Sequence, residues 1–392
     1  MFTSKKFLVF IMGIMIFFCI SCNANQRVET TMKENIKKIK NEFAPDTRVE
    51  IFDIEVNSKG GGIYLEGATS SKKAYTAIQE LIASAQPKNI SNQVRLLPDE
   101  NLEHTNAIIN ISVGNIRSED SHPSTLITQA MLGTPVKIME NDGWWYRIQT
   151  PDNYIGWIDA SGIEKVSQEK LNKWKNADKV IFTNRYGSVY KSKNTNSGTI
   201  SDIVMGNILQ LVETYDNWYK VIFPDGRTGY IKKEKAQTIP EWQKNIEISG
   251  QSIANLAKEF MGIPYLWGGT SIKGADCSGF VKTVFFMHGI ILQRDASQQT
   301  QYGELVPVDK TYDKLQPGDL IFFGRNRVTH VGIYIGDYEF IHASGLVKVN
   351  SLDKDAPNYS PSRESSIIRA RRIVNSLDED GISIYSENKF YQ

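Results

Sequence analysis

The chain has 392 residues, more than one ordinary domain core needs, so we expect two to four domains. Hydrophobic residues at 41% and charged residues at 23% are values of globular proteins, which excludes a wholly disordered, collagen-like or coiled-coil chain. The net charge of +1 carries no signature of nucleic-acid binding, and three cysteines are too few for a disulfide scaffold.

The start of the chain has the pattern of an export signal. Two lysines precede an uncharged apolar run over residues 7–20, which as a helix spans about 21 Å and is too short to cross a bilayer comfortably. The run ends in Ile20-Ser21-Cys22, and a small residue before a cysteine resembles a bacterial lipoprotein signal over residues 1–22, with Cys22 as the lipidated residue. An ordinary secretory signal without a lipid is the alternative. Both predict an exported chain, and the lipid predicts a membrane-anchored protein of the bacterial envelope that faces the periplasm.

Residues 30–105 are expected to form a small α+β domain. Periodicity predicts a helix over residues 30–43, strands over residues 48–55, 63–67 and 92–97, a glycine turn over residues 59–62, and a second helix from a Ser70 cap to Ala85. No catalytic motif lies in this region, so its function is not predicted.

The next region contains an internal repeat. When the chain is shifted against itself by 73 residues, Gly133 falls on Gly206, Trp145 on Trp218, Pro151 on Pro224, Asp152 on Asp225, and Gly156-Trp157 on Gly229-Tyr230. Alternating apolar residues between these positions predict short strands and tight turns. Such modules resemble bacterial SH3-like barrels, which we expect over residues 106–168 and 177–238. Both tryptophans lie mid-strand in this interpretation and are expected in the barrel cores.

Cys277 is predicted to open a helix. A glycine-rich loop over residues 262–269 leads toward it, Asp276 and Ser278 flank it, and helical spacing follows as far as a Gly289 cap. A helix N-terminus favours the thiolate, which is the nucleophilic form of cysteine. We therefore interpret Cys277 as a nucleophile, and an inert structural cysteine is the alternative.

Two of the five histidines are placed to assist such a nucleophile. His330 lies on a predicted strand over residues 328–335, Gly336-Asp337 is the predicted turn, and His342 lies on the return strand. Because the two histidines are almost equidistant from the turn, we expect them to be cross-strand or diagonal neighbours. One imidazole can take the thiol proton while the other orients it. A zinc site made by Cys277, His330 and His342 is the alternative, which no second cysteine or close histidine pair supports.

Five motifs in this part of the chain resemble, in order, those of the NlpC-type cell-wall cysteine peptidases: Tyr265-Leu266-Trp267-Gly268-Gly269, Asp276-Cys277-Ser278-Gly279-Phe280, Leu315-Gln316-Pro317-Gly318-Asp319-Leu320-Ile321-Phe322-Phe323, His330-Val331-Gly332-Ile333-Tyr334-Ile335-Gly336 and Phe340-Ile341-His342-Ala343. The resemblance covers residues 245–375. It implies a papain-like α+β fold that cleaves peptidoglycan stem peptides at the γ-D-glutamyl to diamino-acid bond.

The resemblance also implies residue roles. Cys277 is the expected nucleophile, His330 the base and His342 the orienting group. The Tyr265 hydroxyl and the Cys277 backbone N–H are expected to hold the developing oxyanion. Packing of the glycine loop alone is the alternative for Tyr265.

Two SH3-like barrels ahead of such a domain resemble a subgroup that acts on released stem peptides with a free N-terminal L-Ala. In that subgroup a segment after the catalytic helix supplies the carboxylate for the substrate ammonium, and here it reads Arg294-Asp295-Ala296-Ser297, so Asp295 matches and Ala296 departs. Tyr154 matches a subgroup tyrosine, whereas Thr134 stands where an acidic residue is expected. Without the resemblance, Arg294 and Asp295 could equally form a surface ion pair. The full set of expected oxyanion and substrate-binding residues is Tyr265, Asp276, Ser278, Asp295, Ser297 and Tyr154.

These observations predict an exported α+β multidomain protein with an α+β head, two SH3-like β-barrels and a papain-like cysteine peptidase. The expected partners are muropeptides and, through the lipid, a membrane, with no nucleic acid and no metal or other cofactor, and we expect a monomer. One alternative is a non-catalytic wall-binding lipoprotein, against which the intact Cys277, His330 and His342 argue. A cell-wall amidase or acyltransferase that uses the same site is another.

Overall fold

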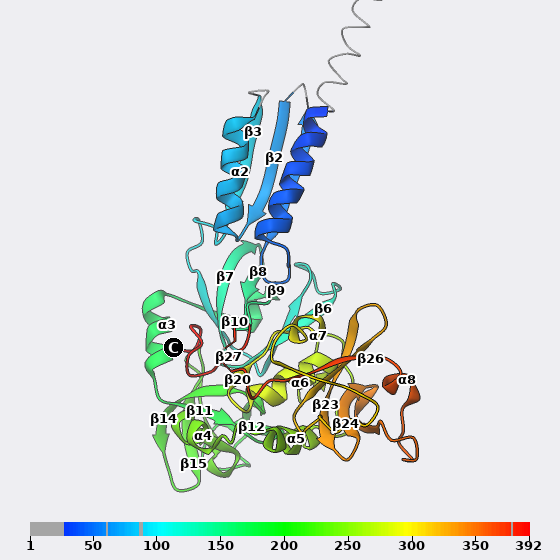
Figure 1. Cartoon of the computed structure of the whole chain (residues 1–392). Helices are drawn as coiled ribbons and strands as arrows, with labels where there is room; N and C mark the ends of the chain where they lie inside the picture. Colours follow the sequence, from blue (N-terminus) through cyan, green and yellow to red (C-terminus); the bar gives the residue numbers. More distant parts are fainter. Residues whose placement is uncertain (1–26, 60–61, 86–88, 378) are drawn as a thin grey trace, which may run out of the picture. The chain divides into compact units, whose positions relative to one another are not determined.

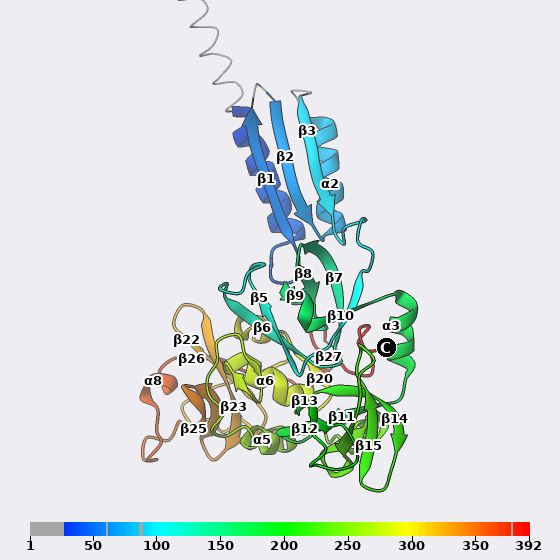
Figure 2. The same ribbon diagram turned by 180° about the vertical axis from the view of Figure 1, so that it is seen from behind.

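The computed structural model describes residues 27–59, 62–85, 89–377 and 379–392. Cys22 and the rest of the predicted signal, and Gly60 and Gly61 of the predicted turn, lie outside the described residues. The chain divides into two units, Met1–Leu102 and Glu103–Gln392 (Figures 1 and 2). No helix in the described part of the chain is both long enough and apolar enough to span a membrane.

The first unit is a three-stranded sheet with two helices on one face, as the two opposite views agree (Figures 1 and 2). A helix over residues 27–43 is followed by β1 (Phe52–Lys59), β2 (Gly62–Thr69), α2 (Lys72–Ser84) and β3 (Ile90–Leu96). The first strand begins at Phe52, later than predicted, because the Asp46 carbonyl accepts hydrogen bonds from Val49 and Glu50 and makes a turn there. Ser71 rather than Ser70 caps α2, since its side chain accepts from Ala74 N.

The second unit begins with two β units that have the same strand order, β10-β4-β7-β8-β9-β5-β6 and, read in reverse, β17-β11-β14-β15-β16-β12-β13. Gly133 and Gly206 fall at equivalent turns with φ of 84° and 88°, a backbone conformation that favours glycine. The duplication inferred from the sequence is therefore present in the topology. The strands are β4 (Asn106–Ile109), β5 (Val113–Arg117), β6 (Leu126–Met131), β7 (Pro135–Asp142), β8 (Trp145–Gln149), β9 (Ile155–Asp159) and β10 (Ile163–Val166), then, after α3 (Gln168–Asn176), β11 (Lys179–Phe182), β12 (Tyr186–Tyr190), β13 (Thr199–Val204), β14 (Ile208–Thr214), β15 (Trp218–Ile222), β16 (Thr228–Lys232) and β17 (Ala236–Thr238).

The two repeat tryptophans differ in burial. Trp218 is buried, as expected, with 8% of its surface exposed. Trp145 is only half-buried, and it is the first residue of β8 rather than a mid-strand residue, with its ring 4.9 Å from that of His122. The expectation of a core position is therefore wrong for Trp145. Trp218 is also the first residue of its strand, so the mid-strand expectation is wrong for both, but Trp218 is packed against the ring of Tyr190, with centroids 5.7 Å apart.

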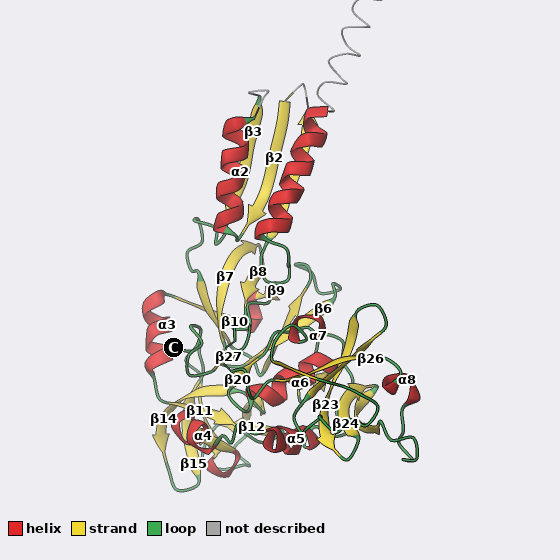
Figure 3. Cartoon of the chain, in the orientation of Figure 1, coloured by secondary structure: helices red, strands yellow, loops and turns green. Residues whose placement is uncertain are grey.

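The last part of the unit is a six-stranded antiparallel sheet, ordered β21-β26-β22-β23-β24-β25, with helices packed against it (Figure 3). Phe280 and Val284 of α6 share a core with Val331 and Ile341 of the sheet. The elements are α4 (Ile239–Asn245), α5 (Gly250–Lys258), β18 (Thr270–Ser271), β19 (Gly274–Ala275), α6 (Cys277–Phe286), β20 (Ile290–Ile291), α7 (Ala296–Gln299), β21 (Glu304–Val306), β22 (Leu320–Gly324), β23 (Val328–Gly336), β24 (Glu339–Ser344), β25 (Leu346–Ser351), α8 (Pro361–Glu364), β26 (Ile367–Arg372) and β27 (Ser383–Ile384).

The hairpin of β23 and β24 carries the two histidines. Gly336 pairs with Glu339, so the turn residues are Asp337 and Tyr338, one position later than predicted. Both have positive φ, 50° and 63°, as in a type I′ turn, whose twist matches that of the two strands.

The C-terminal segment, beyond the predicted end of the domain at residue 375, joins the barrels to this sheet. β27 pairs with β20, and the Asn388 side chain donates to the carbonyl of Pro151 in the first barrel. Tyr385 packs against Trp242, with ring centroids 5.2 Å apart. Met131 of the first barrel and Ile208 of the second contribute to the hydrophobic core of the last domain, and the second barrel also has a core of its own.

Candidate active site

Cys277 is the first residue of α6, as the sequence predicts. Asp276 caps the helix by accepting from Gly279 N at 2.8 Å, and its second oxygen accepts from Gly268 N at 2.9 Å. A Cβ on Gly279 would lie 2.0 Å from the Gly269 carbonyl oxygen, so only glycine lets the loop and the helix approach this closely. The sulfur of Cys277 lies at the backbone N–H of Val331, the residue after His330. The fold therefore brings the thiol to the histidine strand.

Arg294 holds the turn around the thiol. Its guanidinium is fully buried, donates to both carboxylate oxygens of Asp276, and donates to the Ser278 hydroxyl at 3.0 Å. A surface ion pair between Arg294 and Asp295 is therefore wrong, because tertiary packing turns Arg294 inward toward Asp276. Asp276 and Ser278, which we expected at the substrate, have their side chains on Arg294 and are assigned to positioning Cys277.

His330 and His342 are diagonal neighbours on β23 and β24, with Nε2 of His330 2.6 Å from Nδ1 of His342. Nε2 of His342 lies 2.9 Å from Oδ1 of Asn350, whose Nδ2 donates to the Asn358 carbonyl at 2.8 Å. Because that donation makes Oδ1 the acceptor, His342 carries its proton on Nε2 and accepts on Nδ1. His330 then carries its proton on Nε2, which leaves its Nδ1 as a lone pair able to take a proton.

Burial keeps the thiol and both imidazoles neutral. Burial, followed by the charge of Asp276, raises the pKa of Cys277 to about 11. Burial lowers the pKa of His330 to about 2 and that of His342 to about 4. The sequence favoured a thiolate from the helix dipole, whereas burial of the thiol favours its neutral form. The resting pair is a thiol beside a neutral base.

Tyr265 lies beside the thiol. Its backbone N–H donates to the Gly345 carbonyl at 2.9 Å, and a backbone bridge joins it to Ala275. Burial, then the charges of Cys277 and Asp276, raises the pKa of Tyr265 to about 12. Its hydroxyl keeps its proton at neutral pH and can donate a hydrogen bond, which is what the predicted oxyanion role requires.

Tyr154 and Asp295, predicted to lie at one end of the cleft, are in contact across the two domains. The Tyr154 hydroxyl donates to Oδ2 of Asp295 at 3.1 Å, and Tyr154 is 6% exposed. Asp295 is the N-cap of α7, whereas Ser297 is exposed on α7. The Thr134 side chain hydrogen-bonds Tyr391. Tyr154 and Asp295 are therefore in contact, whereas the Thr134 side chain contacts the C-terminal segment instead.

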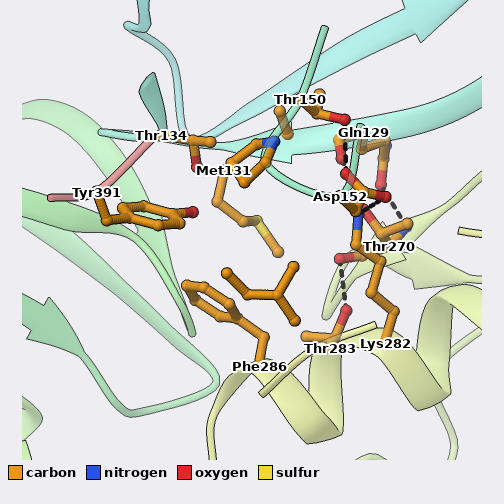
Figure 4. A pocket seen from close by; sticks show the side chains of 13 residues that line it. Gln129, Met131, Thr134, Thr150, Asp152, Thr270, Lys282, Thr283, Phe286 and Tyr391 are labelled. Atoms are coloured by element: carbon orange, nitrogen blue, oxygen red, sulfur yellow. Dashed lines mark hydrogen bonds and ion pairs between the residues drawn. The ribbon is translucent and has the colours of Figure 1, made fainter. Parts of the chain in front are cut away.

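A cavity of about 60 Å³ lies between the first barrel, α6 and the C-terminal segment (Figure 4). Met131, Phe286 and Tyr391 contribute to its walls, and Asp152 faces Lys282 at its edge. Cys277, His330 and His342 are not among the lining residues, so this cavity is separate from the thiol site.

Two further residues at this site, Asn350 and Arg363, are not predicted by the sequence. Asn350 pairs with Phe340, two residues from His342, so it lies diagonally opposite His342 on the next strand. If the pairing of β24 with β25 were known, the alternation of side chains along β25 would place Asn350 on the same face of the sheet as His342. Arg363 lies over the Phe323 ring, with Cζ 5.7 Å from the ring centroid. Within the described ranges, no group of three or more His, Cys, Asp or Glu side chains is arranged to hold a metal ion.

Comparison with known proteins bears on this arrangement. The NlpC/P60 family model matches residues 262–362, and the bacterial SH3 domain model matches residues 112–164 and 186–235. A Bacillus cereus protein named gamma-D-glutamyl-L-lysine dipeptidyl-peptidase is 33% identical over 253 residues, 61% of this chain and 74% of that protein. This chain belongs to the NlpC/P60 family.

Two further relatives agree with this membership. Dipeptidyl-peptidase 6 of Lysinibacillus sphaericus is 29% identical over 274 residues, 67% of this chain and 97% of that protein. The crystal structure of an NlpC/P60 family protein from Bacillus cereus has a TM-score of 0.59 at 26% identity and covers 69% of this chain and 99% of that chain. The expected fold class, two SH3-like barrels and a papain-like α+β domain, and the expected class of enzyme, a cysteine peptidase, are confirmed for this NlpC/P60 protein.

Proposed function

We propose that this NlpC/P60 peptidase hydrolyses the γ-D-glutamyl to L-diamino-acid bond of peptidoglycan stem peptides. The observation that carries the proposal is the thiol of Cys277 on a helix N-terminus beside the hydrogen-bonded chain His330–His342–Asn350. The names of two relatives, gamma-D-glutamyl-L-lysine dipeptidyl-peptidases of Bacillus cereus and Bacillus subtilis, support this bond.

In the first half of the reaction, Cys277 Sγ attacks the γ-carbonyl carbon while its proton passes to Nδ1 of His330. The carbonyl π electrons move to oxygen, and the Tyr265 hydroxyl with the Cys277 backbone N–H stabilises that oxyanion. The intermediate collapses, the C–N bond breaks, and the His330 proton passes to the leaving amine. His342 and Asn350 hold His330 in the tautomer that this transfer needs.

In the second half, a water molecule attacks the thioester while His330 takes its proton. The C–S bond breaks, the proton returns to sulfur, and the γ-carboxylate product leaves. One water is consumed per bond, and the thiol and the neutral imidazole are restored.

We propose further that the substrate is a released stem peptide with a free N-terminal L-Ala. A dipeptidyl-peptidase must recognise the amine two residues before the cleaved bond. The Asp295 carboxylate, held by the Tyr154 hydroxyl at 3.1 Å, is a suitable acceptor for that ammonium.

The test is kinetic measurement of wild type and Asp295→Asn on free and N-acetylated L-Ala-γ-D-Glu-L-Lys. Because a hydrogen bond between charged groups is lost, we expect acetylation to lower kcat/KM about thirty- to a thousandfold. Asp295→Asn should lose a similar factor on the free peptide and little on the acetylated one. Equal rates on both peptides would contradict amine recognition, and product masses other than those of L-Ala-γ-D-Glu and Lys would contradict the proposed bond.

We propose that the protein is a monomer. For localisation, we propose a lipoprotein anchored through Cys22 in the bacterial envelope, with the described domains on the periplasmic side. The run of residues 7–20 followed by Ser21-Cys22 supports this. Palmitate labelling and detergent partitioning of wild type against Cys22→Ser test it, and equal behaviour of the two proteins would contradict it.

A further inference from the structure

Arg363 lies next to the catalytic histidine. Its guanidinium Cζ is 5.7 Å from the centroid of the Phe323 ring, and that ring is 5.7 Å from the ring of His330, the cross-strand partner of Phe323. The short helix α8 that carries Arg363 is fixed by Glu364, which accepts hydrogen bonds from the hydroxyls of Tyr312 at 3.3 Å and Tyr359 at 2.5 Å. Arg363 is thus held on an anchored segment at the rim of the thiol site.

Arg363 has no anionic partner among the residues that the structure describes. Two other arginines of this domain have carboxylate partners, Arg294 with Asp276 and Arg372 with Asp319. The half-buried Arg371 instead donates to the backbone carbonyls of Thr300 and Gly303. The guanidinium of Arg363 makes no ion pair or hydrogen bond within the described chain, and it lies in electrostatic range of Cys277, His330 and His342. After burial, its charge is a further cause that lowers the pKa of both histidines. A half-buried cation beside a general base calls for an anion, which the substrate can supply.

The position of Arg363 assigns that anion to one side of the cleaved bond. The first barrel contacts the loop before Cys277, where Thr270 N donates to Gln129 at 2.9 Å, and it supplies Tyr154 to the amine end. Both opposite views place α8 at the outer edge of the peptidase sheet, away from the first barrel (Figures 1 and 2). If the N-terminal part of the substrate lies on the barrel side of Cys277, the leaving residue lies on the side of Arg363.

We propose that Arg363 binds the α-carboxylate of the leaving diamino acid, so that the enzyme prefers stem peptides that end at this residue. This inference rests on the proposed function. In L-Ala-γ-D-Glu-L-Lys the leaving residue carries its free carboxylate one carbon from the nitrogen of the cleaved bond, and a guanidinium fork matches a carboxylate in two parallel hydrogen bonds. A longer peptide lacks a charge at that carbonyl and gains less from Arg363.

The experiment compares two tripeptides, L-Ala-γ-D-Glu-L-Lys with a free C-terminal carboxylate and the same peptide as its C-terminal amide. Wild type should cleave the acid with a kcat/KM about ten- to a hundredfold above that of the amide, the value of a hydrogen bond to a charged group. Arg363→Gln should cleave the acid and the amide with equal kcat/KM, and Arg363→Lys should keep part of the preference for the acid because it keeps the charge. Arg325→Gln, which removes an exposed arginine of the β22–β23 turn, is the matched control and should keep the full preference.

The amide peptide also monitors the fold, because a misfolded Arg363→Gln would cleave neither peptide. In that case Arg363→Lys supplies the same comparison. Equal wild-type rates on the acid and the amide would overturn the inference, as would an Arg363→Gln enzyme that retains the preference for the acid. Failure of the proposed function is a different result, since neither tripeptide would then be cut between D-Glu and Lys.

Discussion

The carboxylate of Asp152 in the first barrel lies 2.7 Å from the ammonium of Lys282 on α6, the helix that Cys277 opens (Figure 4). The two side chains are 1% and 16% exposed, and the Thr150 hydroxyl donates to the other oxygen of Asp152 at 2.6 Å. The next residues of the same loop lead to Tyr154, whose hydroxyl contacts Asp295. In the second barrel the equivalent Asp225 instead pairs with Arg227. One position of the repeat therefore fastens the first barrel to the catalytic helix.

Breaking this pair should loosen the first barrel from the peptidase. Removing one partner of a buried ion pair leaves the other charge uncompensated, so Asp152→Asn should lower the free energy of unfolding by about 3 to 5 kcal/mol. Because Tyr154 is then less well placed, KM for the free-amine peptide should rise more than kcat falls. Unfolding followed by tryptophan fluorescence and steady-state kinetics measure the two effects.

The matched control for that prediction is the ion pair of Lys273 with Asp202 in the second barrel, whose side chains are 40% and 53% exposed. Asp202→Asn should change the free energy of unfolding by less than about 1 kcal/mol, because solvent screens exposed charges. The exchange Asp152→Lys with Lys282→Asp should recover part of the lost stability. A loss for Asp152→Asn no larger than for Asp202→Asn would contradict the role given to the buried pair.

Substitution of Cys277 should separate chemistry from folding. Cys277→Ala removes the attacking atom, so turnover should fall below about one part in a thousand of wild type. The free energy of unfolding should change by only about 1 kcal/mol, because the side chain is small. Product mass spectrometry and urea unfolding measure the two quantities, and retained hydrolysis would contradict covalent catalysis.

The relation of thiol, base and orienting group could be predicted from the sequence, because it depends on local features: a helix that begins at Cys277 and a hairpin with His330 and His342 almost equidistant from its turn. Asn350 could not, since its place depends on how β25 aligns with β24. The alternative of a surface ion pair between Arg294 and Asp295 is wrong because the true partner of Arg294 is Asp276, which folding brings to it from the other end of α6. The protonation state was mispredicted for a similar reason, since the helix dipole is local and visible in the sequence whereas burial of the thiol is a property of the folded molecule.

The pH dependence of thiol alkylation should distinguish a neutral pair from a preformed thiolate–imidazolium pair. Since burial raises the pKa of Cys277 to about 11, the rate of reaction with iodoacetamide should keep rising from pH 6 to 9. A preformed ion pair would instead give a rate that is constant over this range. Mass spectrometry of the peptide that carries Cys277 measures the rate without interference from other cysteines.

Acid should destabilise the second unit before its carboxylates protonate. Burial lowers the pKa of His330 to about 2, that of His342 to about 4, and that of His288 below its usual range. An unfolded histidine titrates near 6.5, so below this pH the unfolded chain binds more protons than the folded one and stability falls as pH falls. Each of the three histidines adds up to about 1.4 kcal/mol per pH unit to the slope of the free energy of unfolding against pH. The stability that depends on their neutral form is fully present above about pH 7.

Urea unfolding between pH 7.5 and 5 measures this slope. All seven tryptophans lie in the second unit, so their fluorescence reports on it alone. His342→Gln should reduce the slope by the share of one histidine, whatever it does to stability at pH 7.5, because glutamine does not titrate. An identical slope in wild type and His342→Gln would mean that His342 already takes up its proton in the folded enzyme, and the neutral His330–His342 chain assigned here to proton transfer would then be wrong.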